Sequence, residues 1–411
     1  MLNTPLQQYL VVTGNYWAFT LTDGALRMLV VLYFHQLGYQ PLEIAMLFLF
    51  YEFFGVVTNL VGGWLGARLG LNRTMNVGLF LQIASLAMLL VPHEWLTVIW
   101  AMAAQALSGI AKDLNKMSAK SAIKLLVPSN ASGALYKWVA ILTGSKNTLK
   151  GVGFFMGGLL LTLLGFTGAV AAMAIGLLVV WCASLVLLNK DMGKTKNKPK
   201  FSEILSKSRA INYLSAARLF LFGARDVWFV VALPVFLATV LDWPHHWVGT
   251  FMASWVIGYG FVQAFAPKIT GASKNGSTAN TPDNKTAFIW ALPLAVIPIA
   301  IATALYSFDV NTASGLQNIT YALVLGLMVF GALFAINSSV HSFLIVHYAD
   351  SDGVSLDVGF YYMANAMGRL IGTLLSGWVF QEYGLEACLL ISTGFILIAA
   401  ILAAYIPERS H

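Results

Sequence analysis

The sequence has few charged residues and almost no cysteine. Only 10% of its 411 residues are Asp, Glu, Lys or Arg, whereas 58% are hydrophobic and the mean hydropathy is +0.75. Soluble domains carry about 25% charged residues, so this composition excludes an ordinary water-soluble protein. Cys182 and Cys388 each stand alone in an apolar stretch, which excludes a disulfide framework and a thiolate cluster.

Other signals are also missing. The first ten residues contain neither a positively charged region nor a small-residue cleavage site, so we expect the first apolar run to be retained as a helix. The chain lacks a nucleophile elbow, a metal-ligand motif and a phosphate-binding loop. We therefore expect a protein that is not an enzyme, with no cofactor and no metal; His341 and His347 are expected at the membrane interface.

Long apolar runs dominate the sequence. Crossing a hydrocarbon core of about 30 Å takes about 20 apolar residues in a helix, and twelve such runs follow one another with short polar breaks. The fold class predicted is an all-α integral membrane protein with twelve transmembrane helices. The expected spans are 9–36, 42–67, 74–91, 96–117, 136–164, 166–188, 211–241, 247–267, 287–307, 319–341, 358–380 and 385–406.

The distribution of Lys and Arg tests this count, because cytoplasmic loops are enriched in both. Every second predicted loop carries them: Arg68 and Arg73; Lys120, Lys124 and Lys137; seven residues from Lys190 to Arg209; Lys268, Lys274 and Lys285. The intervening loops have none. Both termini are therefore expected in the cytoplasm. This topology accounts for most of the net charge of +7, so we infer no nucleic-acid binding.

The longest charged segment, residues 190–210, lies at the midpoint of the chain. It separates an expected six-helix bundle, 1–189, from a second one, 211–411. A weak repeat supports this division: Asn15-Tyr16 and Gly24-Ala25 in the first span correspond to Asn212-Tyr213 and Gly223-Ala224 in the seventh. Two such halves with a substrate site between them at mid-membrane are the architecture of major facilitator transporters.

Two local patterns resemble motifs of that superfamily. Between the second and third spans, Gly63, Leu65, Arg68, Gly70 and Arg73 match its gating-loop motif, although Ala67 occupies the acidic position and removes the expected carboxylate. In the fifth span, glycines are spaced as in the antiporter motif, with Gly158 in place of its proline; generic helix packing explains them equally well. These glycines are Gly144, Gly153 and Gly157.

Charged residues inside the spans are the most informative feature, since a charge in the bilayer core is costly and normally faces a cavity or a partner. They recur at three- or four-residue spacing, so they form polar stripes on single helix faces, and cations outnumber acids. Such a surplus predicts an anionic substrate. The predicted substrate-binding residues are Arg27, Lys112, Lys146, Lys150, Arg218, Arg225, Asn337, Asn365 and Arg369.

The acids of these spans allow two interpretations. Asp23, Glu52 and Asp226 are candidates for proton coupling. Alternatively, acids neutralise neighbours: Asp23 with Arg27, Asp113 with Lys116, and Asp226 with Arg225 or Arg218. Even then Lys112, Lys146, Lys150, Arg369 and one arginine of the seventh span have no expected partner other than Glu52. Lys112 and Lys116, near a helix end, could instead extend to the interface.

Several strings are similar to the ArsJ-type organoarsenical efflux permeases of bacterial arsenic-resistance operons. They are DGALRMLVVLYFHQLGY, LFLFYEFFGVVTNLVGGWLGARLGLNRT, AQALSGIAKDLNKMSAKSAIKLLVP and LTGSKNTLKGVGFF. The resemblance covers essentially the whole chain. It implies a bacterial inner-membrane protein that exports 1-arseno-3-phosphoglycerate, the product that a glyceraldehyde-3-phosphate dehydrogenase makes from arsenate, and so confers arsenate resistance.

The residues themselves agree with this substrate. It carries an anionic group at each end, so two cationic clusters are a reasonable requirement, and neither cysteine has a partner in sequence for trivalent arsenite. The main alternative is an organophosphate or carboxylate antiporter unrelated to arsenic. A membrane sensor would need an output domain, and an enzyme would need a catalytic motif; the sequence has neither.

Overall fold

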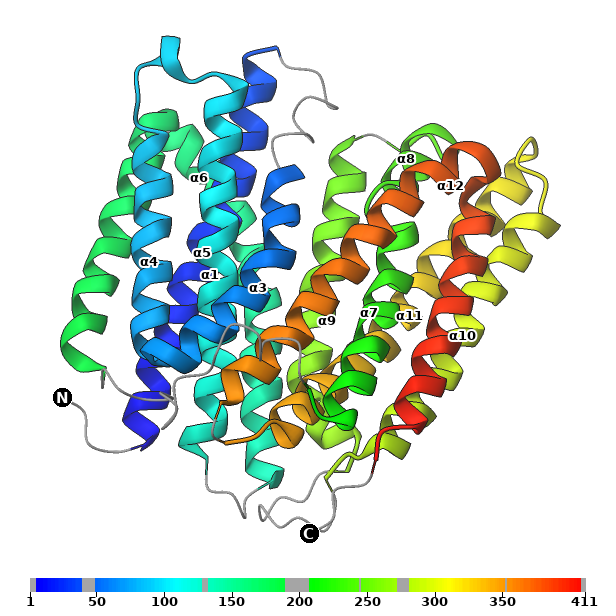
Figure 1. Ribbon diagram of the computed structural model, residues 1–411. Helices are drawn as coiled ribbons and strands as arrows, with labels where there is room; N and C mark the ends of the chain where they lie inside the picture. The colour runs from blue at the N-terminus through cyan, green and yellow to red at the C-terminus, as the bar shows by residue number, and fades with distance from the viewer. Residues whose placement is uncertain are drawn as a thin grey trace.

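The computed structural model describes residues 5–38, 49–127, 132–188, 207–243, 245–271, 281–351 and 353–407, and every regular element within them is a helix. The helices form two bundles side by side (Figure 1). Most of the expected linker, 190–210, lies outside the described residues. Helix α1 begins and α12 ends at the lower side of the molecule in Figure 1.

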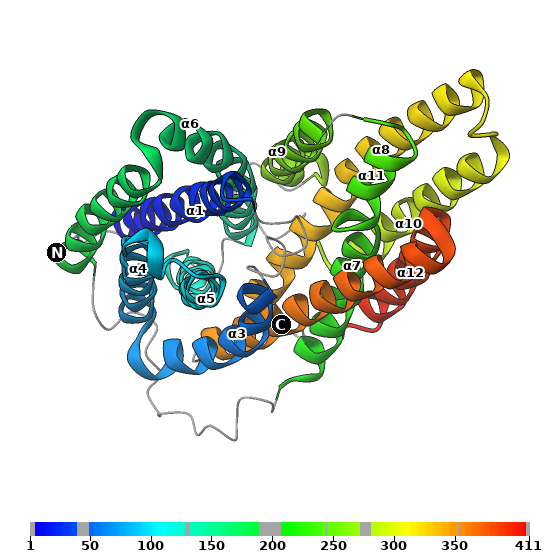
Figure 2. The same ribbon diagram turned by 90° about the horizontal axis from the view of Figure 1, so that it is seen from above.

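The first bundle contains the helices of the N-terminal half. Its α5 lies inside, surrounded by α1, α3, α4 and α6 (Figure 2). The elements are α1 (Pro5–Gln36), α3 (Leu49–Leu69), α4 (Leu71–Met88), the short 3-10 helix η1 (His93–Trp95), α5 (Val98–Leu126) and α6 (Ser132–Leu187).

The second bundle contains the remaining helices. It consists of α7 (Arg209–Phe229), α8 (Ala232–Thr239), α9 (His245–Ile269), α10 (Asn284–Ser307), α11 (Ala313–Tyr348) and α12 (Val354–Ala404). The ribbon views place α9 next to α6, and α12 next to α3 (Figures 1 and 2).

Glycines divide the two longest helices. Gly165 interrupts α6 with φ 67°, and Gly384 interrupts α12 with φ 80°, a left-handed conformation that glycine adopts without a steric penalty. Each helix is therefore two membrane crossings joined by a tight turn, at the positions where the sequence predicts span boundaries. With α7 and α8 taken as one crossing, the described helices supply twelve, and the predicted fold class is confirmed.

The expected span 211–241 is not one continuous helix. It breaks between α7 and α8, because Pro234 has no N–H and its ring clashes with the carbonyl four residues earlier. Ser376 of α12 accepts hydrogen bonds from the N–H groups of Val231 (3.3 Å) and Ala232 (3.1 Å). The hydroxyl thus satisfies backbone donors that the break would otherwise leave bare.

The expected fourth span, 96–117, is too short. Helix α5 continues to Leu126, so Lys120, which we expected in a cytoplasmic loop, lies on a helix and is only 2% exposed. Lys116 is 9% exposed, and its predicted extension to the interface is wrong. Continuing the stripe of Lys112 and Lys116 by four residues would have identified Lys120.

Small residues allow the two bundles to approach closely. A Cβ on Gly63 of α3 would lie 2.5 Å from the carbonyl oxygen of Ser355 and 3.0 Å from Cα of Gly359 in α12. A Cβ on Gly144 of α6 would lie 2.5 Å from the carbonyl oxygen of Gly260 in α9. Gly144 therefore has a packing role between the bundles.

The other two glycines of the fifth-span pattern pack within the first bundle. A Cβ on Gly153 would meet the backbone of Leu21 and Ala25 in α1, and one on Gly157 would meet the carbonyl of Ala25. Gly144, Gly153 and Gly157 therefore all make close helix-packing contacts, as the packing explanation of the glycine pattern predicts.

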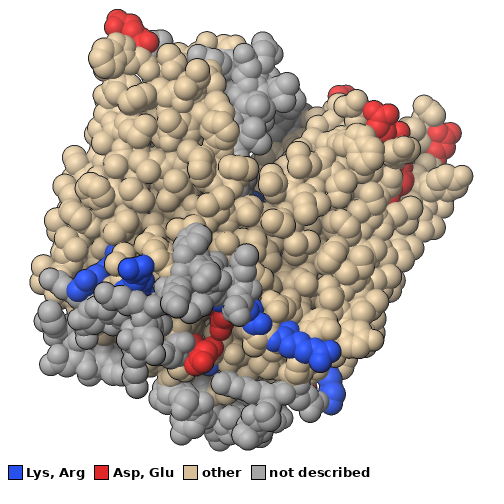
Figure 3. Space-filling model, viewed as in Figure 1, with Lys and Arg blue, Asp and Glu red and all other residues tan. Residues whose placement is uncertain are grey.

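On the face of the molecule shown in Figure 3, positive and negative side chains gather at opposite ends. Lys and Arg side chains gather near the lower rim and acids mainly at the upper ends of both bundles (Figure 3). Seven stretches of the described helices are apolar and long enough to cross a membrane. The tan zone between the two charged rims is the surface that such a membrane would cover.

We predict that Gly63→Ala lowers the melting temperature of the protein in detergent, since the added methyl group overpacks the contact with α12 and costs about 1–3 kcal/mol. The matched control is Gly176→Ala, where nothing lies within 4 Å of the added Cβ; there the better helix propensity of alanine should leave stability unchanged or raise it slightly. Equal melting temperatures for the two variants would contradict this account of the contact.

Candidate functional site

Positive side chains of both bundles meet at the centre of the molecule. They come from α1, α5 and α6 in the first bundle and from α7 and α12 in the second. Coulombic interactions link Lys120 to Lys116, Lys146 and Arg218, and Arg369 to Lys116, Lys146 and Lys150. Lys150 also interacts with Arg27. We call these residues, together with Lys112 and Arg225, the cationic column.

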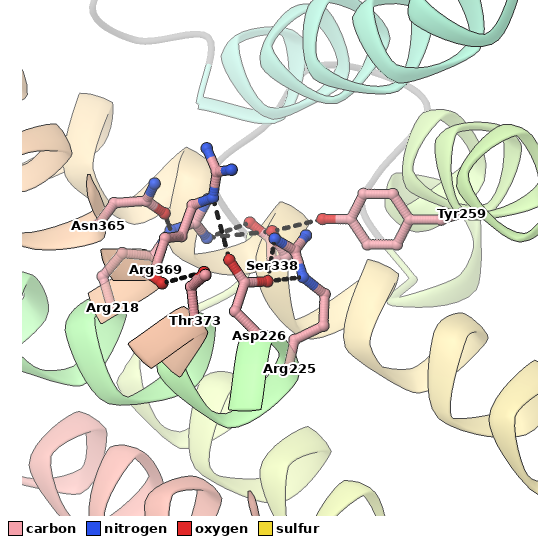
Figure 4. A network of polar contacts seen from close by, with 8 residues as sticks. All are labelled: Arg218, Arg225, Asp226, Tyr259, Ser338, Asn365, Arg369 and Thr373. Atoms are coloured by element: carbon pink, nitrogen blue, oxygen red, sulfur yellow. Dashed lines mark hydrogen bonds and ion pairs between the residues drawn. The ribbon is translucent and has the colours of Figure 1, made fainter. Parts of the chain in front are cut away.

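The best-defined part of the column surrounds Asp226, which is fully buried (Figure 4). Arg225 donates to one carboxylate oxygen from Nε (2.6 Å) and Nη2 (2.5 Å), and Arg369 donates from Nε to the other oxygen (3.1 Å). Two guanidinium groups thus share one carboxylate. The expectation that Arg369 lacks a partner is wrong, whereas the pairing of Asp226 with Arg225 is confirmed.

Glycines bring α7 and α12 close enough for this arrangement. A Cβ on Gly368 would collide with the backbone of Leu219, and one on Gly372 would lie 2.8 Å from the carbonyl oxygen of Gly223 and 3.0 Å from Cβ of Asp226. Asp226 and Arg369 can therefore meet although they are 143 positions apart in sequence. The side chains of Arg225 and Arg369 remain 15% and 30% exposed, so both can contact a ligand.

Arg218 is 3% exposed, and its hydrogen-bond partners among the described residues are neutral. Its Nε donates to Oδ1 of Asn365 (2.9 Å), and Nη1 donates to the hydroxyl and the carbonyl oxygen of Ser338 (3.1 Å each; Figure 4). Tyr259 donates its hydroxyl to the same serine (3.0 Å). Amides and hydroxyls hold this guanidinium in place without neutralising it.

In the first bundle, Tyr51 organises the upper part of the column. Its hydroxyl donates to Oδ1 of Asp23 (2.7 Å). The guanidinium of Arg27 lies 4.2 Å from the centre of the Tyr51 ring, and the ammonium of Lys112 lies 3.7 Å from it, both within the range of a cation–π interaction. The Asp23 carboxylate therefore accepts a hydrogen bond from a tyrosine hydroxyl, in addition to any contact with Arg27.

Lower on α5, Lys116 pairs with Asp113 at 2.6 Å, as the sequence suggested. Tyr362 of α12 faces this pair across the bundle interface, with its ring centre 4.7 Å from Nζ of Lys116 and 5.1 Å from Nζ of Lys120. Lys146 and Lys150 are half-buried on α6. The structure thus brings Lys112, Lys146, Lys150, Arg218 and Arg369 into one region.

Two predicted site residues do not join the described column. Asn337 is fully buried and donates its amide to the carbonyl oxygen of Ala287 in α10 (2.9 Å), so it has a packing role there. The side chain of Glu52 lies outside the described part of the structure. Residues that the sequence did not single out as binding residues, but that the structure places there, are Lys116, Lys120, Tyr51 and Tyr259.

The predicted gating loop connects α3 and α4. Gly70, at φ 100°, joins the two helices, and its carbonyl oxygen accepts a hydrogen bond from the N–H of Thr74 (3.1 Å). Arg68 lies over the ring of Trp64 (5.1 Å), and Arg73 is exposed. Close backbone packing at Gly63 and Gly66 brings this segment against Ser355 of α12.

The arrangement can bind and position an anion. Within the described residues, no group of three or more His, Cys, Asp or Glu could hold a metal ion. Guanidinium forks are suited to bidentate contacts with phosphate or carboxylate oxygens. Since the column is built from both bundles, rocking one bundle against the other would change its geometry.

Two helical bundles that enclose a polar site at mid-membrane define a membrane transporter. The sequence model of the Major Facilitator Superfamily matches residues 12–276, more than half of the chain, so the protein belongs to that superfamily. A search of curated proteins gave no significant match.

Solved structures share the fold. The E. coli fucose:proton symporter FucP superimposes with a TM-score of 0.74 at 11% identity over 99% of this chain and 100% of that one. A bacterial homologue of the iron transporter ferroportin, in its outward-facing state, gives 0.72 at 13% identity over 99% and 100%. The human organic anion transporter MFSD10 gives 0.70 at 14% identity over 98% and 100%. At such identities the likeness concerns the fold alone.

We predict that Asp226→Asn destabilises the protein by about 1–3 kcal/mol, because it leaves two partly buried guanidinium groups without the negative charge that they share. Adding Arg225→Gln should restore part of that loss. The exposed Asp242→Asn is the matched control and should have no effect, as asparagine tolerates the positive φ of 52° found there. Denaturation in detergent, monitored by tryptophan fluorescence, measures the stability of all three variants. An Asp226→Asn variant as stable as the unsubstituted protein would contradict the role of Asp226 as a carboxylate shared by two arginines.

Proposed function

We propose that this transporter exports a doubly anionic organoarsenical, 1-arseno-3-phosphoglycerate, by alternating access. The observation that carries the proposal is the cationic column at the interface of the two bundles. Among the side chains that the structure describes, Asp23, Asp113 and Asp226 are too few to neutralise it, and surplus positive charge in a low-dielectric environment favours an anionic ligand. Arg225 and Arg369 are positioned to contact such a ligand.

The arsenic part of the proposal depends on sequence. The strings similar to ArsJ-type permeases include the stripe of α5 and the lysines of α6, so they coincide with the column. A carrier of trivalent arsenite would be expected to use thiolates, yet Cys182 is exposed on α6 and Cys388 is buried in α12. We propose a functional link to a glyceraldehyde-3-phosphate dehydrogenase, which would supply the ester.

The proposed orientation has both termini in the cytoplasm of a bacterial cell, with the chain in the inner membrane. The Lys and Arg side chains at the lower rim support it (Figure 3). On that side the bundles touch: Lys124 of α5 donates to the carbonyl oxygen of His347 in α11 (2.9 Å), and Tyr136 contacts the ring of Phe343 (5.0 Å). In this orientation the described contacts close the cytoplasmic side.

A second candidate is an antiporter of ordinary organophosphates or carboxylates. The column favours anions in general, and one structure of the same fold is that of a human organic anion transporter. Transport of 3-phosphoglycerate at rates equal to those of the arsenylated ester would favour this candidate.

We expect Arg225→Ala to abolish arsenate resistance in a sensitive bacterial host, because it removes a partly exposed guanidinium of the cationic column; Arg27→Ala should do the same. Arg209→Ala is the matched control, since Arg209 is exposed at the start of α7. Survival on arsenate is measured at matched membrane expression. Full resistance of the Arg225 variant would refute its role in binding.

A proton gradient should drive export if one of the candidate acids couples it. In everted vesicles we expect uptake of the arsenylated ester to rise when a gradient is imposed. Asp23→Asn, which keeps an acceptor for the Tyr51 hydroxyl, should preserve exchange of substrate but abolish the stimulation. If the gradient still stimulates uptake by the Asp23→Asn variant, Asp23 is not the coupling acid, and Glu52 and Asp226 remain as candidates.

A further inference from the structure

The lower part of the column contains a group of polar side chains of which the predicted binding site includes only Arg218. Lys116 and Lys120 of α5 lie over the ring of Tyr362, and Lys120 is in Coulombic contact with Arg218 of α7. Arg218 in turn lies 5.2 Å from the ring centre of Tyr361. Cations from both bundles thus converge on two neighbouring tyrosines of α12.

The positive charge there is only partly compensated. Lys120 donates to the hydroxyl of Thr143 (2.8 Å), and Arg218 donates to neutral groups. Asp113 pairs directly with Lys116 and also interacts electrostatically with Lys146. Burying a cation against neutral partners is costly, yet Lys120 and Arg218 are only 2% and 3% exposed. A structural role for packing does not account for two such charges side by side.

Among the described residues, three buried hydroxyls in the same place make no hydrogen bond of normal geometry: those of Tyr361, Tyr362 and Ser342. The tyrosine rings are in contact, with centroids 5.0 Å apart, and Ser342 of α11 interacts with both tyrosines without reaching normal hydrogen-bond geometry. Unsatisfied buried hydroxyls are uncommon in folded proteins. Three of them beside surplus cations match the needs of an oxyanion, which accepts several hydrogen bonds.

We propose that Lys116, Lys120, Arg218, Tyr361, Tyr362 and Ser342 form an anion subsite, the lower subsite, which binds one oxyanion group of the substrate. Arg225 and Arg369 bind a second anionic group higher in the column. The substrate is therefore an organic ester or acid with two separate anionic groups. This inference rests on the proposed function as an organic-anion transporter, but it does not require arsenic.

The column sets a scale for such a ligand. Along α5, each step of four residues rises about 6 Å, so Lys120 lies about 12 Å below Lys112. The guanidinium carbons of Arg218 and Arg225 lie 3.9 and 4.9 Å from the centre of the same ring, that of Phe222, so a short chain with an anionic group at each end fits between the lower and the upper group of cations. A larger substrate with one charge would leave one group of cations without a counterion.

Two ligands that share a phosphate test the proposal. 3-Phosphoglycerate carries a second anionic group, its carboxylate, whereas glycerol 3-phosphate does not. Binding to the purified full chain in lipid nanodiscs is measured by isothermal titration calorimetry. We expect 3-phosphoglycerate to bind at least about tenfold more tightly, since the added charge-assisted contacts are made in a buried site. Equal affinities, or no binding of either ligand, would overturn the proposal.

Lys120→Met and Tyr362→Phe then assign the subsite. Both should lose most of the preference for 3-phosphoglycerate while the affinity for glycerol 3-phosphate changes little. Lys120→Met should also melt at the same or a higher temperature, because it removes a buried charge; a purely structural lysine would give a lower one. Lys137→Met, at an exposed position of α6, is the control. A preserved preference in Lys120→Met refutes the subsite.

The outcomes separate this inference from the proposed function. If the preference for two anionic groups holds and resistance to arsenate is not conferred, the subsite is retained and the arsenic assignment fails. The opposite outcome is that the protein confers arsenate resistance, and that Lys120→Met and Tyr362→Phe change neither this resistance nor the preference for 3-phosphoglycerate. In that case the subsite is refuted and the proposed function is retained.

Discussion

The arrangement of this transporter depends on positive charge that is buried between its two bundles and is not fully neutralised within the described residues. Two acids of the column are shared: Asp226 accepts hydrogen bonds from two arginines, and Asp23 accepts one from a tyrosine hydroxyl. Repulsion among the remaining cations opposes the approach of the bundles. The glycine contacts of α3 with α12 and of α6 with α9 hold the bundles together against it.

Aromatic rings replace carboxylates as partners for several of these cations. One ring lies beside two cations in three places: Tyr51 beside Arg27 and Lys112, Tyr362 beside Lys116 and Lys120, and Phe222 beside Arg218 and Arg225. A cation–π contact contributes about 0.5–2 kcal/mol and leaves the charge intact. The rings therefore keep the cations in position while preserving the field that attracts an anion. Acids in the same places would cancel it.

Sequence reasoning predicted the crossings well and the contacts between them poorly. Hydropathy located the breaks at Gly165 and Gly384, because this signal is local. Helical spacing correctly placed Lys112 and Lys116 on one face. Spacing cannot show which helix lies opposite, so the contact of Arg369 with Asp226 was missed. Asn337 was assigned to the site because it is polar and intramembrane, but α10 lies beside it and receives its amide.

The two bundles contribute different kinds of cation. The first supplies Lys112, Lys116, Lys120, Lys146 and Lys150, together with Arg27, whereas the second supplies only arginines, Arg218, Arg225 and Arg369. Lysine is a point charge on a flexible stem, and arginine a planar fork with fixed donor directions.

The arginine forks of the second bundle are held by Asp226, Asn365 and Ser338, so in the proposed function they would define the orientation of an oxyanion before it binds. The lysines of α5 and α6 can follow the anion as one bundle moves against the other. In the proposed alternating access, the fixed arginines of the second bundle and the flexible lysines of the first would keep the ligand bound while the two bundles move.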